Sequence, residues 1–286
     1  MSEQQTVTYK LDGEVALVGL NRPDKRNCFN PTVMKQLREA IERAGEEAKC
    51  GIIFGHGENF CAGLDLRWAA ENWKDGRSRR LPFAFNRKTY FEEMARGNIP
   101  FIAALHGATL GGGLETAAAA HIRVADETTY FGLPEGTRGI FIGGGGSVRV
   151  ARLIGFARMQ DMMLTGRVLK SEEAERCGIV QYIVPKGQHI AKAKELALKI
   201  CKNAPLSNFA ITNSLPRLQD MSYDDGSISS AWWPNTRGAR NRSRGYTNSS
   251  TRPRRVCGRI TPERGDVRRR QWACETTPSS VMPKPR

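Results

Sequence analysis

The sequence predicts an α/β fold with layers of parallel strands, and two observations indicate this class. Short apolar stretches alternate with helical patterns over about 200 residues, an order typical of α/β proteins. Glycine-bearing turns follow two of these stretches, at 60–66 and at 107–115. The chain has 286 residues, of which 40% are hydrophobic, and this is enough to bury the core of one large domain.

The expected elements begin with a hairpin and a capped helix. Strands are expected at 5–10 and 14–20, with Asp12-Gly13 as the turn between them. A helix is expected to begin at Asn30-Pro31, because asparagine is a favoured N-cap and proline a favoured first helical residue. Further strands are expected at 50–54, 101–105 and 128–131, and further helices at 89–97, 114–120, 144–153, 156–164, 171–176, 187–203 and 206–220. Residues 70–88 are polar and basic without a clear period, and we expect a loop there.

The positive charge of the chain is concentrated near its C-terminus. Residues 227–286 hold 13 Arg and 1 Lys against 3 acidic residues, which accounts for +11 of the net charge of +15. We therefore divide the chain into a core domain at 1–205, the start of a C-terminal helical region at 206–226, and an atypical Arg-rich tail at 227–286. The composition of the tail predicts that it is mostly disordered. Nucleic-acid binding through the tail is an alternative function, but an isolated charge run is usually solvated, so we do not expect it.

Cysteine, histidine and hydropathy patterns indicate a protein of the cytoplasm. The seven cysteines form no CxxC pair, and we interpret them as free thiols in a reducing compartment. The four histidines stand far apart, so we expect no metal site. Residues 1–10 lack the apolar segment of a signal peptide. No stretch approaches 18 uninterrupted apolar residues, so we expect no membrane span.

Three consecutive glycines, Gly111–Gly113, stand where the second glycine-bearing turn meets an Ala-rich helix. Glycine lets a ligand approach the backbone without a clash at Cβ. A helix N-terminus offers unpaired N–H groups and a partial positive charge. A substrate oxygen that gains negative charge would be stabilised there. The alternatives are a close-packed turn and a phosphate-binding loop, and the latter fits poorly because Leu114-Glu115 follow in place of Lys-Ser/Thr.

Two glutamates lie close to this turn in the sequence. Glu115 is in the first turn of the helix that the glycines open, and Glu135 follows the strand expected at 128–131. Two carboxyl groups beside an anion-stabilising turn suit acid–base chemistry on an enolate. Alternatively, Glu115 complements the helix dipole and Glu135 is an exposed turn residue.

These segments together resemble the crotonase (enoyl-CoA hydratase/isomerase) superfamily. The resemblance is carried by residues 15–31, 51–66, 99–155 and 162–185, which include NRPDKRN, FCAGLDL, GATLGGGLE and FGLPEG. It extends from residue 5 to about residue 220, with several motifs in the family's order. It implies a spiral of ββα units, a homotrimer or dimer of trimers, and an acyl-CoA substrate. Coenzyme A would be part of that substrate, and no separate cofactor is implied.

The resemblance also implies roles for individual residues. The N–H groups of Leu64 and Gly112 would form an oxyanion hole for the thioester oxygen. Contacts to substrate or CoA would come from Lys25, Arg26, Ala62, Asp65, Leu66 and Gly111; for Lys25 and Arg26 a solvated turn is the alternative. Glu115 and Glu135 match the two catalytic glutamates of the family's hydratases.

The resemblance therefore favours an enoyl-CoA hydratase, a lyase that adds water across the Cα=Cβ bond of a 2-enoyl-CoA. An isomerase, a hydratase–lyase acting on an aromatic enoyl-CoA, and a protein that binds CoA thioesters without turnover are the alternatives. Ile142 stands where the family's hydratases usually have proline. His121 stands where aspartate is frequent, and we interpret it as structural. Residues 70–88, with Trp73, Phe83 and Phe85, are expected to line the acyl end of the pocket.

Overall fold

The computed structural model describes residues 5–72 and 89–231. The first range contains β1 (Val7–Asp12), β2 (Val15–Leu20), the 3-10 turn η1 (Pro23–Lys25), α1 (Pro31–Glu47), β3 (Cys50–Gly55) and α2 (Leu66–Asn72). The second range contains α3 (Tyr90–Arg96), β4 (Phe101–Leu105), β5 (Ala108–Leu110), α4 (Gly112–Ala119), β6 (Ile122–Asp126), β7 (Tyr130–Gly132), η2 (Gly136–Arg138), α5 (Gly146–Ile154), α6 (Phe156–Thr165), β8 (Val168–Lys170), α7 (Ser171–Arg176), β9 (Tyr182–Val184), α8 (His189–Cys201), α9 (Pro205–Leu218) and α10 (Tyr223–Ala231).

Two sheets organise these elements and confirm the predicted α/β class. A six-stranded sheet has the order β1-β2-β3-β4-β6-β9, and all its pairs are parallel except β1 with β2. A three-stranded sheet has the order β5-β7-β8, with β5 and β7 parallel and β7 and β8 antiparallel. The predicted parallel layers are therefore present.

The chain passes repeatedly from the large sheet to the small one and then into a helix. β4 lies in the large sheet, β5 in the small one, and α4 follows; β6, β7 and α5 repeat this order. The preceding unit has only a single bridge, Cys61 to Thr109, in place of a second strand. This is the predicted spiral of ββα units. Because the second-layer segments run parallel, the turns that follow them gather at one edge.

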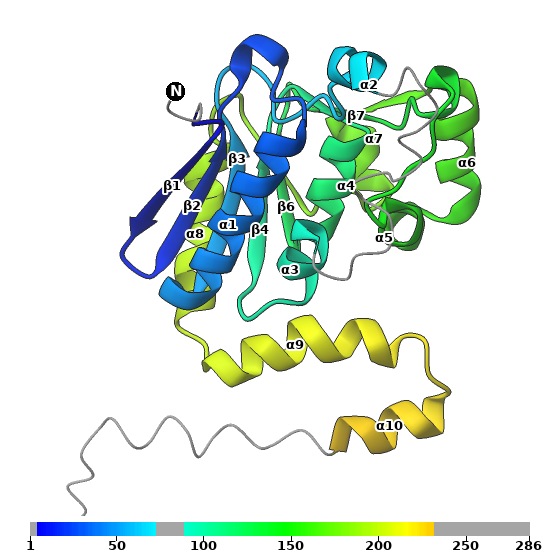
Figure 1. Cartoon of the computed structure of the whole chain (residues 1–286). Helices are drawn as coiled ribbons and strands as arrows, with labels where there is room; N and C mark the ends of the chain where they lie inside the picture. Colours follow the sequence, from blue (N-terminus) through cyan, green and yellow to red (C-terminus); the bar gives the residue numbers. More distant parts are fainter. Residues whose placement is uncertain (1–4, 73–88, 232–286) are drawn as a thin grey trace, which may run out of the picture. The chain divides into compact units, whose positions relative to one another are not determined.

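The large sheet separates two apolar cores, and side chains on its strands alternate between them. Val15, Ile52 and Ile102 pack with α8 on one face. Ala16 and Ile53 pack on the other face, in the core that includes α1, α3 and α4. Figure 1 shows α1 and α8 on opposite faces of this sheet. Among the helices of the described residues, none has the length and apolar character needed to span a membrane.

Local sequence explains the start of α1. The Asn30 side chain accepts a hydrogen bond from the Val33 N–H at 2.9 Å, and Pro31 is the first helical residue. This confirms the predicted capped start. The predicted hairpin turn is displaced by one residue, because Asp12 still pairs with Val15 and the loop is Gly13-Glu14. Gly13 takes a positive φ of 63°, which glycine adopts without strain.

Several expectations about individual elements are wrong. The strands β5, β6, β8 and β9 were not expected from the sequence. Residues 70–72 belong to α2 and not to a loop, and residues 227–231 end α10 and are not a disordered tail. The rest of the expected loop, 73–88, lies outside the described residues with Trp73, Phe83 and Phe85. The rest of the Arg-rich tail, 232–286, also lies outside them.

Candidate active site

The segment 61–65 is held in an extended shape by its neighbours on both sides. Cys61 pairs with β5, because its N–H donates to Ala108 and its carbonyl accepts from Leu110. On the other side, the Phe29 N–H donates to the Gly63 carbonyl at 2.8 Å, and the Phe29 carbonyl accepts from the Asp65 N–H at 2.9 Å. These bonds fix the direction of every peptide group in the segment.

The Leu64 N–H is left free by this arrangement. Successive N–H groups of an extended segment point to opposite sides, so the Leu64 N–H points away from Phe29 when the Asp65 N–H points toward it. Within residues 5–72 and 89–231, it donates to no protein group. Gly63 has a φ of 91°, and a Cβ at this position would stand 2.9 Å from the Leu110 carbonyl oxygen. Only glycine fits both conditions.

Gly112 brings a second free N–H beside this segment. It is the first residue of α4, and its N–H has no acceptor among the residues that the structure describes. The Gly112 nitrogen lies 3.3 Å from the point where a Cβ on Gly63 would stand. The two N–H groups predicted to form an oxyanion hole therefore belong to adjoining backbone segments, one of them at a helix N-terminus with its partial positive charge.

The carboxyl group of Glu115 is buried one turn into α4. Only 5% of the residue is exposed. Its Oε1 atom accepts hydrogen bonds from the N–H groups of Gly144 at 2.6 Å and Gly146 at 3.0 Å. Ile142 packs beside Glu115. A Cβ built on Gly146 would stand 2.6 Å from Glu115 Cγ and 2.7 Å from Ile142 Cδ1, so the two side chains meet at this glycine. Ile142, which departs from the family's usual proline, therefore forms part of the apolar wall around this carboxyl.

Glu135 lies between β7 and η2, beside the residue that precedes α4. The residue is also 5% exposed. Its Oε1 atom lies 2.8 Å from the point where a Cβ on Gly111 would stand, so glycine at position 111 leaves room for the carboxyl. Its Oε2 atom is buried and makes no hydrogen bond with any described residue.

Burial changes the ionisation of both glutamates. The pKa of Glu115 is raised from 4.5 to about 7, chiefly by burial and also by the charge of Glu135, while the N–H groups of Gly146 and Gly144 and the charge of Arg149 oppose the rise. Burial also raises the pKa of Glu135. Gly111 connects the two groups, because Glu135 Oε1 lies beside it and the Gly111 carbonyl accepts the Glu115 N–H at 3.0 Å. Two interacting carboxyl groups with raised pKa values, beside free N–H donors, are typical of acid–base sites.

The residues predicted to bind CoA fall into two adjoining turns. Lys25 and Arg26 are exposed at η1, and the Arg26 carbonyl accepts the N–H of Ala62 at 3.0 Å. Leu66, at the start of α2, is 43% exposed. Gly111 lies between the second turn and Glu135, because its Cα is 3.6 Å from the point where a Cβ on Gly63 would stand and a Cβ of its own would stand 2.8 Å from Glu135 Oε1.

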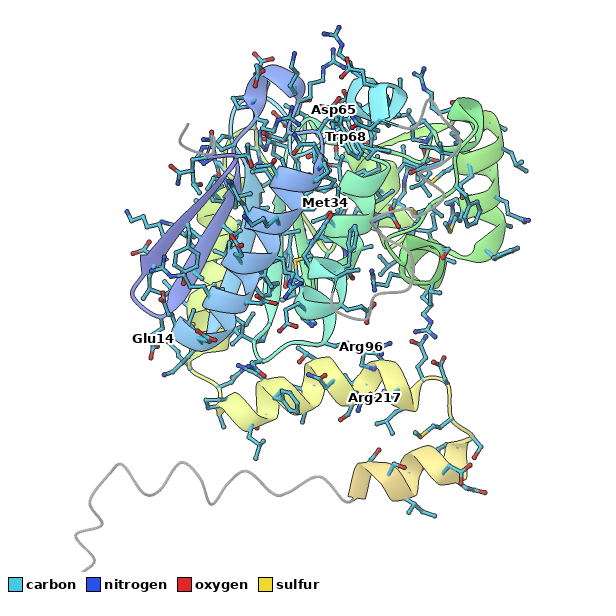
Figure 2. The ribbon with its side chains drawn as sticks, viewed as in Figure 1. Glu14, Met34, Asp65, Trp68, Arg96 and Arg217 are labelled. Carbon is cyan, nitrogen blue, oxygen red and sulfur yellow. The ribbon has the colours of Figure 1, made fainter. Side chains whose placement is uncertain are left out.

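Asp65 already has partners within the protein. Its Oδ2 atom pairs with Arg22 at 3.1 Å, and its Oδ1 atom accepts the Trp68 N–H at 3.1 Å, which caps α2. Figure 2 shows Asp65 and Trp68 together at the start of this helix. A contact of Asp65 with CoA stays a prediction, and these bonds indicate a role in holding the turn.

Sequence reasoning missed the residues that hold the site in place. Asn27 is buried in the left-handed region at φ 56°. Its side chain accepts from Arg22 N–H and donates to the carbonyls of His56 and Asn59. The glycine run 143–146 was given no role from the sequence, although it supplies both donors to Glu115.

His121 has a structural role, and the Cys61 thiol helps to hold the site by accepting the Gly63 N–H at 3.3 Å and donating to the Asn27 carbonyl at 3.1 Å. His121 Nδ1 accepts the Phe101 N–H at 3.0 Å, and burial lowers its pKa to about 4, which agrees with a structural role. Cys28, Cys50, Cys61, Cys177 and Cys201 are free thiols. The described residues include no group of three or more His, Cys, Asp or Glu side chains placed to bind a metal ion.

Comparison with known proteins identifies the family. Residues 10–224 match the Enoyl-CoA hydratase/isomerase family. The chain belongs to this family. Among hydratase/isomerase relatives, an enoyl-CoA hydratase of Mycobacterium tuberculosis is 34% identical over 216 residues, which cover 73% of this chain and 79% of the relative. A 2,3-dehydroadipyl-CoA hydratase of Escherichia coli is 33% identical over 216 residues, covering 74% and 82%.

Solved structures of this hydratase/isomerase group share the fold. The crystal structure of a candidate enoyl-CoA hydratase from Rhodopseudomonas palustris is 40% identical, with a TM-score of 0.75, and the match covers 84% of this chain and 94% of that one. An enoyl-CoA hydratase from Mycobacterium tuberculosis has a TM-score of 0.73 at 28% identity, covering 82% and 90%. The resemblance predicted from the sequence is therefore confirmed at the level of family and fold.

Proposed function

We propose that this protein adds water across the Cα=Cβ bond of a 2-enoyl-CoA thioester. The observation that carries the proposal is the presence of two buried carboxyl groups with raised pKa values, Glu115 and Glu135, near the start of α4, where the Gly112 N–H has no acceptor among the described residues. Hydration needs an acceptor for one proton and a donor of another, together with stabilisation of the enolate between them. All three requirements have groups that could meet them here.

In the proposed reaction, the thioester oxygen accepts hydrogen bonds from the N–H groups of Leu64 and Gly112. Such preorganised donors lower a barrier by roughly 3 kcal/mol each. Glu115 takes a proton from water while the water oxygen bonds to Cβ, and the electron pair of the double bond moves to the thioester oxygen. The enolate then collapses and takes a proton at Cα from Glu135. A proton passed back from Glu115 to Glu135 restores the starting state.

The hydrogen bonds of the two glutamates support this division of roles. Glu115 Oε1 accepts two backbone N–H groups, and such bonds favour a carboxylate. Burial raises the pKa of Glu135 against one hydrogen bond from its own backbone, and its Oε2 atom has no donor among the described residues, so burial favours the neutral acid. The role of Glu115 as proton acceptor requires its carboxylate, which a pKa of about 7 makes available at neutral pH and above.

The test is hydration of crotonyl-CoA and cinnamoyl-CoA, followed by the loss of enoyl-thioester absorbance and by product mass. We expect the wild type to add the mass of one water, and Glu115→Gln and Glu135→Gln each to lose about 100-fold or more in kcat. Glu172→Gln, an exposed carboxylate on α7, is the matched control and should keep its activity. A product of unchanged mass would indicate an isomerase, and release of an aldehyde would indicate a hydratase–lyase. Thioester binding without turnover would refute catalysis.

We also propose that the chain acts in the cytoplasm, as its scattered cysteines indicate, and that it forms a homotrimer or dimer of trimers, as the family resemblance implies. Phe141, Phe156 and Leu164 are 75%, 68% and 79% exposed in the single chain, which supports burial against other copies. Light scattering on the purified full chain tests this state. A mass equal to one chain at all concentrations would contradict it.

A further inference from the structure

Arg149, on α5, has no role in the mechanism above, yet its side chain contacts three parts of the site's surroundings. Its Nη1 atom donates to Glu92 Oε1 of α3 at 2.8 Å. Its Nη2 atom donates to the Gly144 carbonyl. Its guanidinium carbon lies 5.9 Å from the centre of the Phe91 ring. The side chain is 18% exposed, so water screens these contacts only in part.

The Gly144 contact is significant because this residue also holds Glu115. The Gly144 N–H donates to Glu115, and its carbonyl accepts from Arg149. The Gly146 N–H also donates to Glu115, and the Gly145 carbonyl of the same peptide group accepts the Arg149 backbone N–H at 3.1 Å as part of the first turn of α5. The Arg149 side chain itself binds the carbonyl of Gly144, the residue whose N–H binds the glutamate.

A glycine-rich segment depends on contacts with its neighbours to keep one backbone conformation. Four consecutive glycines, 143–146, restrict their own dihedral angles very little, so the unbound segment has many accessible shapes. Phe91 closes one side of the segment, because a Cβ on Gly144 would stand 2.4 Å from its ring. The Arg149 guanidinium closes the other side against Gly145, where a Cβ would stand 2.7 Å from Nη2.

The position of Arg149 leaves one of its donors, the Nε–H group, buried without a partner among the described residues. A buried donor without a partner costs about 1–3 kcal/mol, so a side chain needed only for a surface ion pair would gain little by adopting this position. The buried position of the side chain is explained if the planar guanidinium group must reach Glu92 with one terminal nitrogen and the Gly144 carbonyl with the other.

We propose that Arg149 is a positioning residue for Glu115: it clamps the 143–146 segment in the shape that presents two N–H groups to this carboxyl and places a positive charge beside it. The proposal rests on the proposed function, since it assigns Glu115 the role of accepting a proton. The charged and titratable groups around Glu115 are Glu135 after β7, Tyr90 on α3, and Arg149 itself, with Glu92 paired to Arg149.

The two effects of Arg149 can be separated by substitution. Arg149→Gln removes the charge, and the lost attraction should move the acid limb of the kcat–pH profile upward by about 0.5 to 1 pH unit. Arg149→Lys keeps the charge but not the planar fork, so it should lower kcat by about 10-fold while the acid limb stays in place. Arg152→Gln is the matched control, because Arg152 lies on the same helix but pairs with Asp220 at 2.8 Å. It should change neither quantity.

The decisive experiment combines these profiles with infrared titration of the Glu115 carboxyl band, isolated by subtraction of the Glu115→Gln spectrum. The titration needs no substrate, so it tests the clamp even if the wild type fails to hydrate enoyl-CoA. A higher titration midpoint in Arg149→Gln than in wild type supports the proposal, and an unchanged midpoint overturns it. If Arg149→Gln does not fold, Glu92→Gln replaces it: removal of that negative charge should lower the midpoint, and a rise would overturn the proposal.

Discussion

The raised pKa of Glu115 predicts that this residue costs the protein stability when it ionises. The relevant perturbation is Glu115→Gln, which keeps an acceptor for the N–H groups of Gly144 and Gly146 but cannot ionise. In the wild type, the folded state holds the proton up to a pKa of about 7, whereas the ordinary value is 4.5. Between these values the folded state binds more protons than the unfolded state, so the free energy of unfolding falls as pH rises.

The magnitude follows from the distance between the two pKa values. A rise of about 2.5 pH units at 1.36 kcal/mol for each unit corresponds to about 3 kcal/mol lost above pH 7. About 2 to 3 kcal/mol of this loss falls between pH 5 and pH 8. The Glu115→Gln variant does not lose this free energy of unfolding, because glutamine does not ionise. Its free energy of unfolding relative to wild type should therefore grow by this amount over the same range.

Urea unfolding at pH 5, 6, 7 and 8, at one protein concentration, measures this difference. Glu195→Gln provides a control of known sign, because Lys192 and Lys199 lower the pKa of Glu195 to about 2. That contribution is complete above the ordinary pKa and is lost only in acid, so the Glu195→Gln difference should stay constant from pH 5 to pH 8. A Glu115→Gln difference that also stays constant would refute the claim that burial raises this pKa.

Three further predictions concern the segments that carry the site. Asn27→Ala removes the partner of the Arg22 N–H and of the part-buried carbonyls of His56 and Asn59, at about 1–3 kcal/mol for each, so urea unfolding should show a loss of about 3 kcal/mol or more; a loss below 1 kcal/mol would contradict the structural role of Asn27. Gly63→Ala forces a side chain onto φ 91° and against the Leu110 carbonyl, which should cost about 1–3 kcal/mol and abolish hydration; an active, equally stable variant would refute the predicted strain. Asn30→Ala removes the N-cap of α1 and should cost about 1 kcal/mol without changing KM, as thermal unfolding and kinetics can show.

The sequence was sufficient to predict those parts of the fold that local patterns encode. The Asn30-Pro31 start, the strands at 50–54 and 101–105 and the glycine turns carry signals within a few residues of each other. The strands β5, β8 and β9 have only three residues each, too few to show a period of two. β5 also follows β4 after only two residues, so the two were taken as one strand and a turn.

The candidate site was predictable only in part, for a related reason. Glu115, Glu135, Leu64 and Gly112 stand in recognisable motifs, but the groups that hold them are far away in the sequence. The bond from Gly144 to Glu115 joins residues 29 positions apart. A run of glycines gives no indication of which carboxylate it will bind, because its N–H groups become specific donors only after α4 and α5 have packed together.

The two proposed donors of the oxyanion hole differ from the two glutamates in how mutation can remove them. A main-chain N–H is supplied by every amino acid except proline, so most codon changes at position 64 leave the donor in place. A carboxyl group, in contrast, is lost in nearly every substitution at positions 115 or 135. Amino-acid substitutions during evolution would therefore affect the two parts of the site differently. One or two substitutions can alter proton transfer, while the main-chain donors that polarise the thioester carbonyl remain. New reactions in such a spiral would inherit an enolate-stabilising backbone and differ in the side chains around it.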